Sequence, residues 1–284
     1  MSTSTPPSAP AATTNKAAPA SADTASTGPT DEQILAYETH VKDTDALAHE
    51  LVSIPLPLSD LLQEYASNAA FLPKIHNLAA QYALFRRCRG DGNCFYRAVV
   101  YAWFERVLLR PARYLKRARQ QLDDAKHLLL ANGFQLLVIE DFLDVAVDTL
   151  DALATGAIAD QDALLSRFQA DHISNALVVL FRFIASAYLQ VHADDYAPFI
   201  LDYADDMTTF CNQHVEAMGR ESDEIQIIAL TKQLQVNVAV AYLDASKSDR
   251  ATVHKFEGNE TDPADEWIHL LYRPGHYDLI YPRS

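Results

Sequence analysis

The most informative part of the sequence is Arg89-Gly90-Asp91-Gly92-Asn93-Cys94-Phe95-Tyr96-Arg97-Ala98. The Asp91-Gly92 pair favours a tight turn, because Asp hydrogen-bonds to nearby backbone and Gly accepts a positive φ. Helical spacing begins directly after Cys94, with apolar side chains at Phe95, Ala98, Val99, Ala102 and Trp103. The pattern predicts that Cys94 lies at the N-terminus of a helix that follows a turn.

A cysteine in this position has the chemistry of a nucleophile. The N–H groups and the positive dipole end of a helix N-terminus favour the thiolate, which is the reactive form. Backbone N–H groups of the preceding turn, around Gly92 and Asn93, are placed to hold an oxyanion. The turn argues against burial of Cys94, whereas Cys88 and Cys211 fit the alternative of small, buried side chains. Cys94 is therefore the candidate nucleophile.

A second group of chemical interest is Gly275-His276-Tyr277-Asp278, at the start of the last apolar segment. Residues two apart on a strand point to the same face, so Asp278 can orient the imidazole of His276. A single histidine is usually structural or solvated, and the assignment therefore depends on the pairing with Cys94. The order of cysteine, then distant histidine, then acid is typical of papain-like cysteine peptidases.

The chain changes its pattern from helical to strand-like along its length. Between residue 31 and about residue 186, apolar side chains recur at helical spacing, for example at Ile34, Leu35, Leu61, Leu62, Tyr65, Leu78, Tyr82 and Phe85. The last 60 residues predict strands at 236–242, 252–256, 267–272 and 276–281. Pro274-Gly275 predicts a type II turn that joins the final two strands as an antiparallel hairpin. We therefore expect an α+β domain with helices packed on a small, mostly antiparallel C-terminal sheet.

Composition separates a tail from this domain. Ala, Ser, Thr and Pro make up 25 of the first 30 residues. Such a segment buries too little apolar surface to offset its chain entropy, so we expect residues 1–30 to be disordered and residues 31–284 to form the domain. No secretory signal is expected, and the most apolar window, 176–191, contains Arg182 and is too short to span a membrane. It predicts a buried helix, and no membrane partner is expected.

Charge and cysteine usage restrict the partners and the compartment. The net charge of −15 makes nucleic acid an unexpected partner and favours a basic or mixed-charge protein surface, although it also serves solubility alone. Three cysteines are too few for a disulfide framework, which predicts a reducing compartment, cytoplasmic or also nuclear. Cys88 and Cys94 lack a second close pair, so no zinc site or other metal site is expected.

The quoted motifs resemble those of the otubains, a branch of the ovarian-tumour (OTU) class of deubiquitinating cysteine peptidases. The run from Asp91 to Arg97 is similar to the family's nucleophile motif. The run Leu270-Leu271-Tyr272-Arg273-Pro274-Gly275-His276-Tyr277-Asp278 is similar to its histidine motif. Two further segments carry the resemblance: Arg220-Glu221-Ser222-Asp223 with Ile227-Ile228-Ala229-Leu230, and Leu58-Ser59 with Glu64-Tyr65. Together they cover residues 31 to about 281.

The resemblance implies a papain-like OTU fold and assigns roles to the site. Cys94 is implied as the nucleophile, His276 as the general base and Asp278 as its orienter, while Asp91 supports an oxyanion loop that includes Gly92 and Asn93. The implied reaction is hydrolysis of the isopeptide bond at the C-terminal Gly of ubiquitin, through a thioester with the enzyme. No metal or organic cofactor is implied.

The same resemblance implies partners. These are ubiquitin, polyubiquitin conjugates and, as a further option, ubiquitin-conjugating enzymes. Residues 31–50 resemble a segment that contacts ubiquitin or such an enzyme. Four residues are candidates to bind ubiquitin, with a solvated surface as the alternative: Glu216, Arg220, Glu221 and Asp223.

The sequence departs from the family pattern at two places. Gly90 and Ala217 stand where the family is expected to carry proline. Neither departure is expected to touch the catalytic atoms, but both leave the preference among ubiquitin linkages open. Two hypotheses about function follow: an active deubiquitinase, and a non-catalytic binder of ubiquitin and conjugating enzymes that inhibits ubiquitin transfer.

Overall fold

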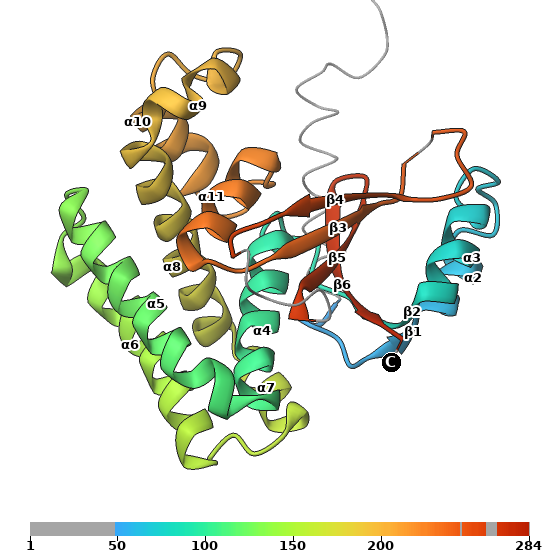
Figure 1. The fold of residues 1–284 in the computed structure, drawn as a ribbon, viewed down its shortest axis with the longest axis horizontal. Helices are drawn as coiled ribbons and strands as arrows, with labels where there is room; N and C mark the ends of the chain where they lie inside the picture. The colour runs from blue at the N-terminus through green and yellow to red at the C-terminus, as the bar shows by residue number, and fades with distance from the viewer. Residues whose placement is uncertain (1–48, 245, 260–265, 284) are drawn as a thin grey trace, which may run out of the picture. The chain divides into compact units, whose positions relative to one another are not determined.

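The computed structural model describes residues 49–244, 246–259 and 266–283 (Figure 1). All of them belong to the second of two units into which the chain divides, His40–Ser284. The predicted disordered tail at 1–30 lies outside the described residues. So does the predicted partner-contacting segment at 31–50, except for its last two residues.

Helices make up most of the described chain. The long ones are α3 Leu72–Gln81, α4 Cys94–Leu109, α5 Pro111–Ala131, α6 Leu136–Thr155, α8 Asp171–Val191 and α11 Glu224–Leu234. The short ones are η1 Leu58–Asp60, α2 Leu61–Glu64, α7 Gln161–Phe168, α9 Ala193–Ile200, α10 Met207–Phe210 and the π-helical turn η2 Cys211–Val215. The predicted helical character of the chain before residue 186 is thus largely confirmed.

One mixed sheet runs through the unit. Its strands are β1 Leu56–Pro57, β2 Tyr82–Arg86, β3 Val238–Tyr242, β4 Thr252–Phe256, β5 Ile268–Arg273 and β6 His276–Pro282. They lie in the order β1-β2-β6-β5-β3-β4. Only the β3–β5 pair is parallel among these, so the sheet is mostly antiparallel as predicted.

The prediction was wrong for the segment around Tyr82 and Phe85. Both residues lie on strand β2, which pairs with β6 near the C-terminus, instead of continuing the helix that contains Leu78. A short apolar run has no period that separates a buried strand from a helix end. The sheet therefore draws two of its strands from the N-terminal part of the chain.

Helix α4 is the centre of the main apolar core. Nearly all of its side chains are buried, because it packs against β6 on one side and against α8 and α5 on the other. Figure 1 shows it lying between the sheet and the long helices. A second apolar cluster fills the space between α3 and the sheet, where Ile75 and Phe85 meet Leu271. A helix buried all round is held rigidly, which fixes the position of its first residue, Cys94.

Two local predictions can be followed in the structure. Helix α8 has the length and composition of a membrane span, but most of it is buried inside the unit, and its Arg182 is fully buried and hydrogen-bonded to main-chain carbonyls. It is therefore a core helix. Strands β5 and β6 form the predicted hairpin, with Gly275 at a φ of 72° as the second central position of a type II turn requires.

Candidate active site

A cleft of about 270 Å³ opens beside the N-terminus of α4. Cys94 lies in its wall together with residues of the β5–β6 hairpin and of the segment before α11, namely Tyr272, Gly275, Tyr277, Glu221, Ser222 and Asp223. Three segments that are distant in the sequence thus meet at one opening. The cleft is the place where a substrate can reach the candidate nucleophile.

Cys94 is the first residue of α4, directly after Asn93 at the N-cap position. Its side chain is only 3% exposed, so the expectation that the turn keeps it from burial was wrong. The reason is that α4 is buried along its whole length, and the thiol is reached only through the cleft. The first N–H groups of a helix have no acceptor within it, so the N–H of Cys94 points out of the helix beside the thiol.

His276 links Cys94 to Asp278. Its Nε2 lies 2.8 Å from Oδ1 of Asp278, and the ring is close enough to Cys94 to interact electrostatically with the thiol. Burial alone would lower the pKa of His276. The hydrogen bond to Asp278 and the electrostatic interactions with Asp278 and Cys94 outweigh burial and raise the pKa from 6.5 to about 10. The imidazole is therefore held in its cationic form at neutral pH.

The carboxylate of Asp278 is fully buried and takes three hydrogen bonds. Oδ1 accepts from His276 and, at 3.0 Å, from the main-chain N–H of Cys88, and Oδ2 accepts from Arg273 at 2.6 Å. Burial alone would raise the pKa of Asp278, but the hydrogen bond to His276 and the positive charges of Arg273 and His276 lower it. A fixed negative charge thus faces the imidazole.

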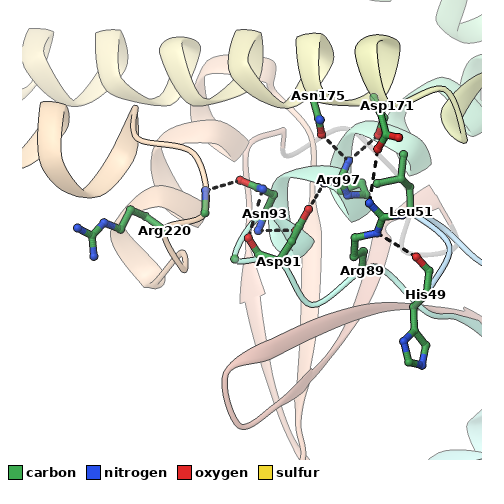
Figure 2. A network of polar contacts seen from close by, with 12 residues as sticks. His49, Leu51, Arg89, Asp91, Asn93, Arg97, Asp171, Asn175 and Arg220 are labelled. Atoms are coloured by element: carbon green, nitrogen blue, oxygen red, sulfur yellow. Dashed lines mark hydrogen bonds and ion pairs between the residues drawn. The ribbon is translucent and has the colours of Figure 1, made fainter. Parts of the chain in front are cut away.

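The turn before Cys94 is tied down by the side chain of Asp91. Its Oδ1 accepts the N–H of Asn93 at 3.0 Å, and its Oδ2 pairs with Arg97 at 2.5 Å (Figure 2). Gly92 has a φ of 73°, and a Cβ there would collide with the carbonyl of Gly219. The turn is therefore rigid, and the N–H of Asn93 is already occupied within it.

Asn93 connects the turn to the segment that precedes α11. Its Oδ1 accepts from the N–H of Gly219 at 2.9 Å and from Arg182 at 2.8 Å, and Arg182 also reaches the carbonyls of Gly92 and Arg220. Figure 2 shows the Asn93 side chain facing this segment. One buried guanidinium from α8 thus connects the turn before Cys94 to the segment before α11.

The four predicted ubiquitin-binding residues do not form one cluster. Glu221 and Asp223 line the cleft, although Asp223 also caps α11 by accepting the N–H of Glu224. Glu216 is partly buried and accepts a hydrogen bond from Ser186 on α8. The exposed side chain of Arg220 points away from the polar network in Figure 2.

The other two thiols lie away from the cleft wall. Burial raises the pKa of Cys88 well above its ordinary value, and it raises the pKa of Cys211 to about 12. Both are buried, as predicted, and both favour the unreactive thiol. Within the part of the chain that the structure describes, no three His, Cys, Asp or Glu side chains gather as metal ligands would.

Sequence reasoning missed the groups that hold the site together. Arg97 lies in the nucleophile motif and Arg273 in the histidine motif, but the sequence indicated no role for either. Glu64, quoted for its resemblance alone, pairs with Arg273 at 2.6 Å. The structural role of Arg182 could be predicted from the sequence, because an arginine inside an apolar helix must find buried hydrogen-bond acceptors.

The prediction about the sequence departure at Gly90 also needs correction. We expected the departure at residue 90 not to touch the catalytic atoms, yet a Cβ at Gly90 would lie 3.5 Å from Nδ1 of His276. That is an ordinary van der Waals distance. Residue 90 is therefore a neighbour of the imidazole, which has more room here than it would beside a larger residue.

Comparison with known proteins gives a consistent result. A sequence model of the family described as Peptidase C65 Otubain matches residues 44–282. Ubiquitin thioesterase OTUB1 of Homo sapiens is 37% identical over 254 residues, which is 88% of this chain and 90% of that protein. The ovarian tumour domain-containing deubiquitinating enzyme 1 of Arabidopsis thaliana is 36% identical over 242 residues, covering 80% of this chain and 79% of that protein.

Solved structures agree with the sequence matches. The structure of h/ceOTUB1 with ubiquitin aldehyde and UBC13~Ub superposes with a TM-score of 0.79 at 32% identity, covering 89% of this chain and 99% of that one. A ceOTUB1 complex with ubiquitin aldehyde and UBC13~Ub gives a TM-score of 0.78 at 31% identity, with 89% and 100% covered. The predicted α+β, papain-like OTU fold is confirmed. The chain belongs to the otubain family of peptidases.

Proposed function

We propose that this protein is a cysteine-type deubiquitinase that hydrolyses the isopeptide bond at the C-terminal Gly of ubiquitin, with Cys94 as nucleophile. One observation carries the proposal: at the wall of an open cleft, the imidazole of His276 is hydrogen-bonded to Asp278 and interacts with Cys94. Relatives named ubiquitin thioesterase cover most of the chain.

The reaction proceeds in two halves. The Cys94 thiolate attacks the carbonyl carbon of the ubiquitin Gly and forms a tetrahedral intermediate. Its collapse breaks the C–N bond, and the leaving lysine amine takes the proton of His276. Water then attacks the resulting thioester, His276 accepts a proton from that water, and ubiquitin leaves with a free carboxylate while the thiolate is restored. These steps need no metal and no organic cofactor.

The surrounding groups stabilise charge in this sequence. Asp278 holds the imidazolium in position through its 2.8 Å contact with His276. The negative oxygen of the tetrahedral intermediate is held by the N–H of Cys94 at the helix N-terminus, together with the N–H of Gly92 in the turn that Asp91 fixes. The N–H of Asn93 is excluded from this role, because it donates to Asp91.

Ubiquitin and ubiquitin-conjugating enzymes are the proposed partners. The structures that superpose on this chain are complexes of OTUB1 proteins with ubiquitin aldehyde and UBC13~Ub or UBCH5B~Ub. In this chain Glu221 and Asp223 give the cleft a negative rim, which suits a basic surface of a protein substrate. We further propose that the protein acts in a reducing compartment, cytoplasmic or also nuclear.

The competing function is a binder that blocks ubiquitin transfer without cleavage. Incubation with ubiquitin dimers of each linkage separates the two, because a pure binder leaves every dimer intact. We expect the wild-type chain and a Cys211→Ala control to cleave at least one linkage, and Cys94→Ala to cleave none. Intact dimers with the folded wild-type protein would favour the binder, and cleavage by Cys94→Ala would overturn the assignment of the nucleophile.

A further inference from the structure

A guanidinium that takes no part in these steps lies behind Asp278. Arg273 is the last residue of β5, and its side chain is about nine-tenths buried. In the β5–β6 hairpin Arg273 pairs with His276 in register and Leu271 pairs with Asp278. Opposed residues and residues two apart share a face, so Arg273, His276 and Asp278 all project to the same side of the sheet.

Arg273 decides the orientation of the carboxylate. Its contact of 2.6 Å with Oδ2 of Asp278 leaves Oδ1 to His276 and to the N–H of Cys88. Rotation of the carboxylate would break the Arg273 contact and the other two together. Since an unpaired buried carboxylate is strongly disfavoured, this arrangement also keeps Asp278 ionised.

Arg273 is itself held from the N-terminal part of the chain. Glu64, at the end of α2, accepts from it at 2.6 Å, and the hydroxyl of Tyr65 lies 3.3 Å away. The second oxygen of Glu64 pairs with Arg87 at 2.6 Å. The imidazole is therefore the end of a chain of charged contacts that runs through Asp278 and Arg273 to α2.

We infer that Arg273 is a positioning residue for the reaction, which keeps Asp278 ionised and aimed at His276, and that Glu64 holds Arg273 in that place. This inference rests on the proposed function, since it assigns a residue to the same reaction. The rival explanation is structural: the ion pairs fasten α2 and its neighbours to the sheet and have no bearing on the chemistry.

The test compares Arg273→Met, Arg273→Lys and Glu64→Gln by steady-state cleavage of a ubiquitin dimer between pH 5 and 9. We expect Arg273→Met to lower kcat about 10- to 100-fold with KM unchanged, as is usual when the support of a functional side chain is removed. The acidic limb of its pH–rate profile should move to higher pH, because Asp278 without the Arg273 cation binds a proton more readily. Arg273→Lys should restore part of the rate, and Glu64→Gln should show a smaller loss with the same shift.

Arg86→Met is the matched control. Arg86 is another buried arginine of the same sheet, it pairs with Glu105 at 3.5 Å, and it lies on β2 outside the site. Loss of Arg86 should lower the melting temperature but leave the pH dependence of the cleavage rate of the folded protein unchanged. If Arg273→Met or Glu64→Gln lowers stability and leaves the profile in place, as Arg86→Met does, the positioning role is wrong.

A double-mutant cycle separates this inference from the proposed function. If Arg273 acts through Asp278, then adding Arg273→Met or Glu64→Gln to Asp278→Asn should lower kcat no further. Independent, multiplying losses would overturn the inference. If Arg273→Met fails to fold, the Glu64→Gln variant alone tests the inference. The Glu64 side chain is one-third exposed, so we expect this variant to fold. The proposed function fails separately, if the folded wild-type chain cleaves no dimer or if Cys94→Ala still cleaves one.

Discussion

The reaction centre and the rim of its cleft are built in opposite ways. Around Cys94 the buried carboxylate of Asp278 is paired with the partly buried imidazole of His276 and with Arg273. The acidic rim and the neighbouring segment are open to solvent, with exposed carboxylates and apolar side chains that include Asp202, Asp205, Glu221, Asp223, Phe199 and Leu201. The chemistry is thus fixed before a substrate arrives, whereas recognition is left to surface groups. Substitutions at the centre should change kcat, and substitutions at the rim should change binding.

The largest effect is expected from Cys94→Ala and His276→Ala. Without the thiol no thioester forms, and without the imidazole the leaving amine has no proton donor. Both variants should lack measurable single-turnover cleavage of a ubiquitin dimer while circular dichroism shows them folded. A folded His276→Ala variant with the wild-type rate would contradict the whole catalytic assignment.

A smaller effect is expected from Asp278, which orients the ring but forms no bond with the substrate. Asp278→Asn keeps the size of the side chain and should reduce kcat by about 10²-fold, the lower end of what a positioned acid–base group contributes. Asp278→Ala also removes one of the two carboxylates that pair with the buried Arg273, so it should lower stability, by less than the about 3–5 kcal/mol that a fully unpaired buried charge costs. Single-turnover rates and denaturant unfolding of both variants measure the two effects.

The ranking of these residues would be wrong if folded Asp278→Asn were as inactive as Cys94→Ala. Orientation of the ring would then matter as much as the nucleophile. Equal stability of Asp278→Ala and wild type would show that the burial of Arg273 is not costly.

The raised pKa of His276 predicts a pH-dependent stability. A group whose pKa rises on folding contributes stability that is complete below its unfolded value and is lost as the pH rises through its folded value. For His276 the window runs from 6.5 to about 10. Denaturant unfolding of the wild type and of His276→Gln should therefore converge as the pH rises through this window. A constant difference would show that the imidazole is not held as a cation.

The smallest effect belongs to the rim. Glu221→Gln should weaken ubiquitin binding less than about tenfold and leave kcat unchanged, because exposed charge pairs contribute only ~0.2–1 kcal/mol each. The loss should shrink at high salt. Asp123→Asn, an exposed acid on α5, is the control in a binding titration. A loss in kcat equal to that of Asp278→Asn would abolish the contrast between centre and rim.

The same contrast explains what could be predicted from the sequence. The turn before Cys94 and the hairpin at His276 follow from local rules, since Gly, Pro and short-range periodicity specify them. The contact between Glu64 and Arg273 joins residues 209 positions apart and has no local signal. It depends on how α2 packs beside the sheet, and so only the folded chain reveals it.

The errors had equally physical causes. The sequence predicts helix where strand β2 lies, because five residues carry no clear period and the partner strand β6 lies almost 200 positions later. The burial of Cys94 was missed because it depends on α4 being enclosed along its whole length. The departure at Gly90 was not expected to touch the catalytic atoms, although the fold brings it beside His276.

The most direct test of the account is to identify the thiol that reacts. A ubiquitin with an electrophile at its C-terminus forms a stable thioether with the attacking cysteine, and peptide mapping locates the bond. We predict that the adduct forms on Cys94 alone, because Cys94 lines the cleft, whereas Cys88 and Cys211 lie outside its wall and have raised pKa values. An adduct on Cys88 or Cys211, or no adduct on the folded chain, would contradict the central claim that Cys94, held by His276 and Asp278, cleaves ubiquitin conjugates.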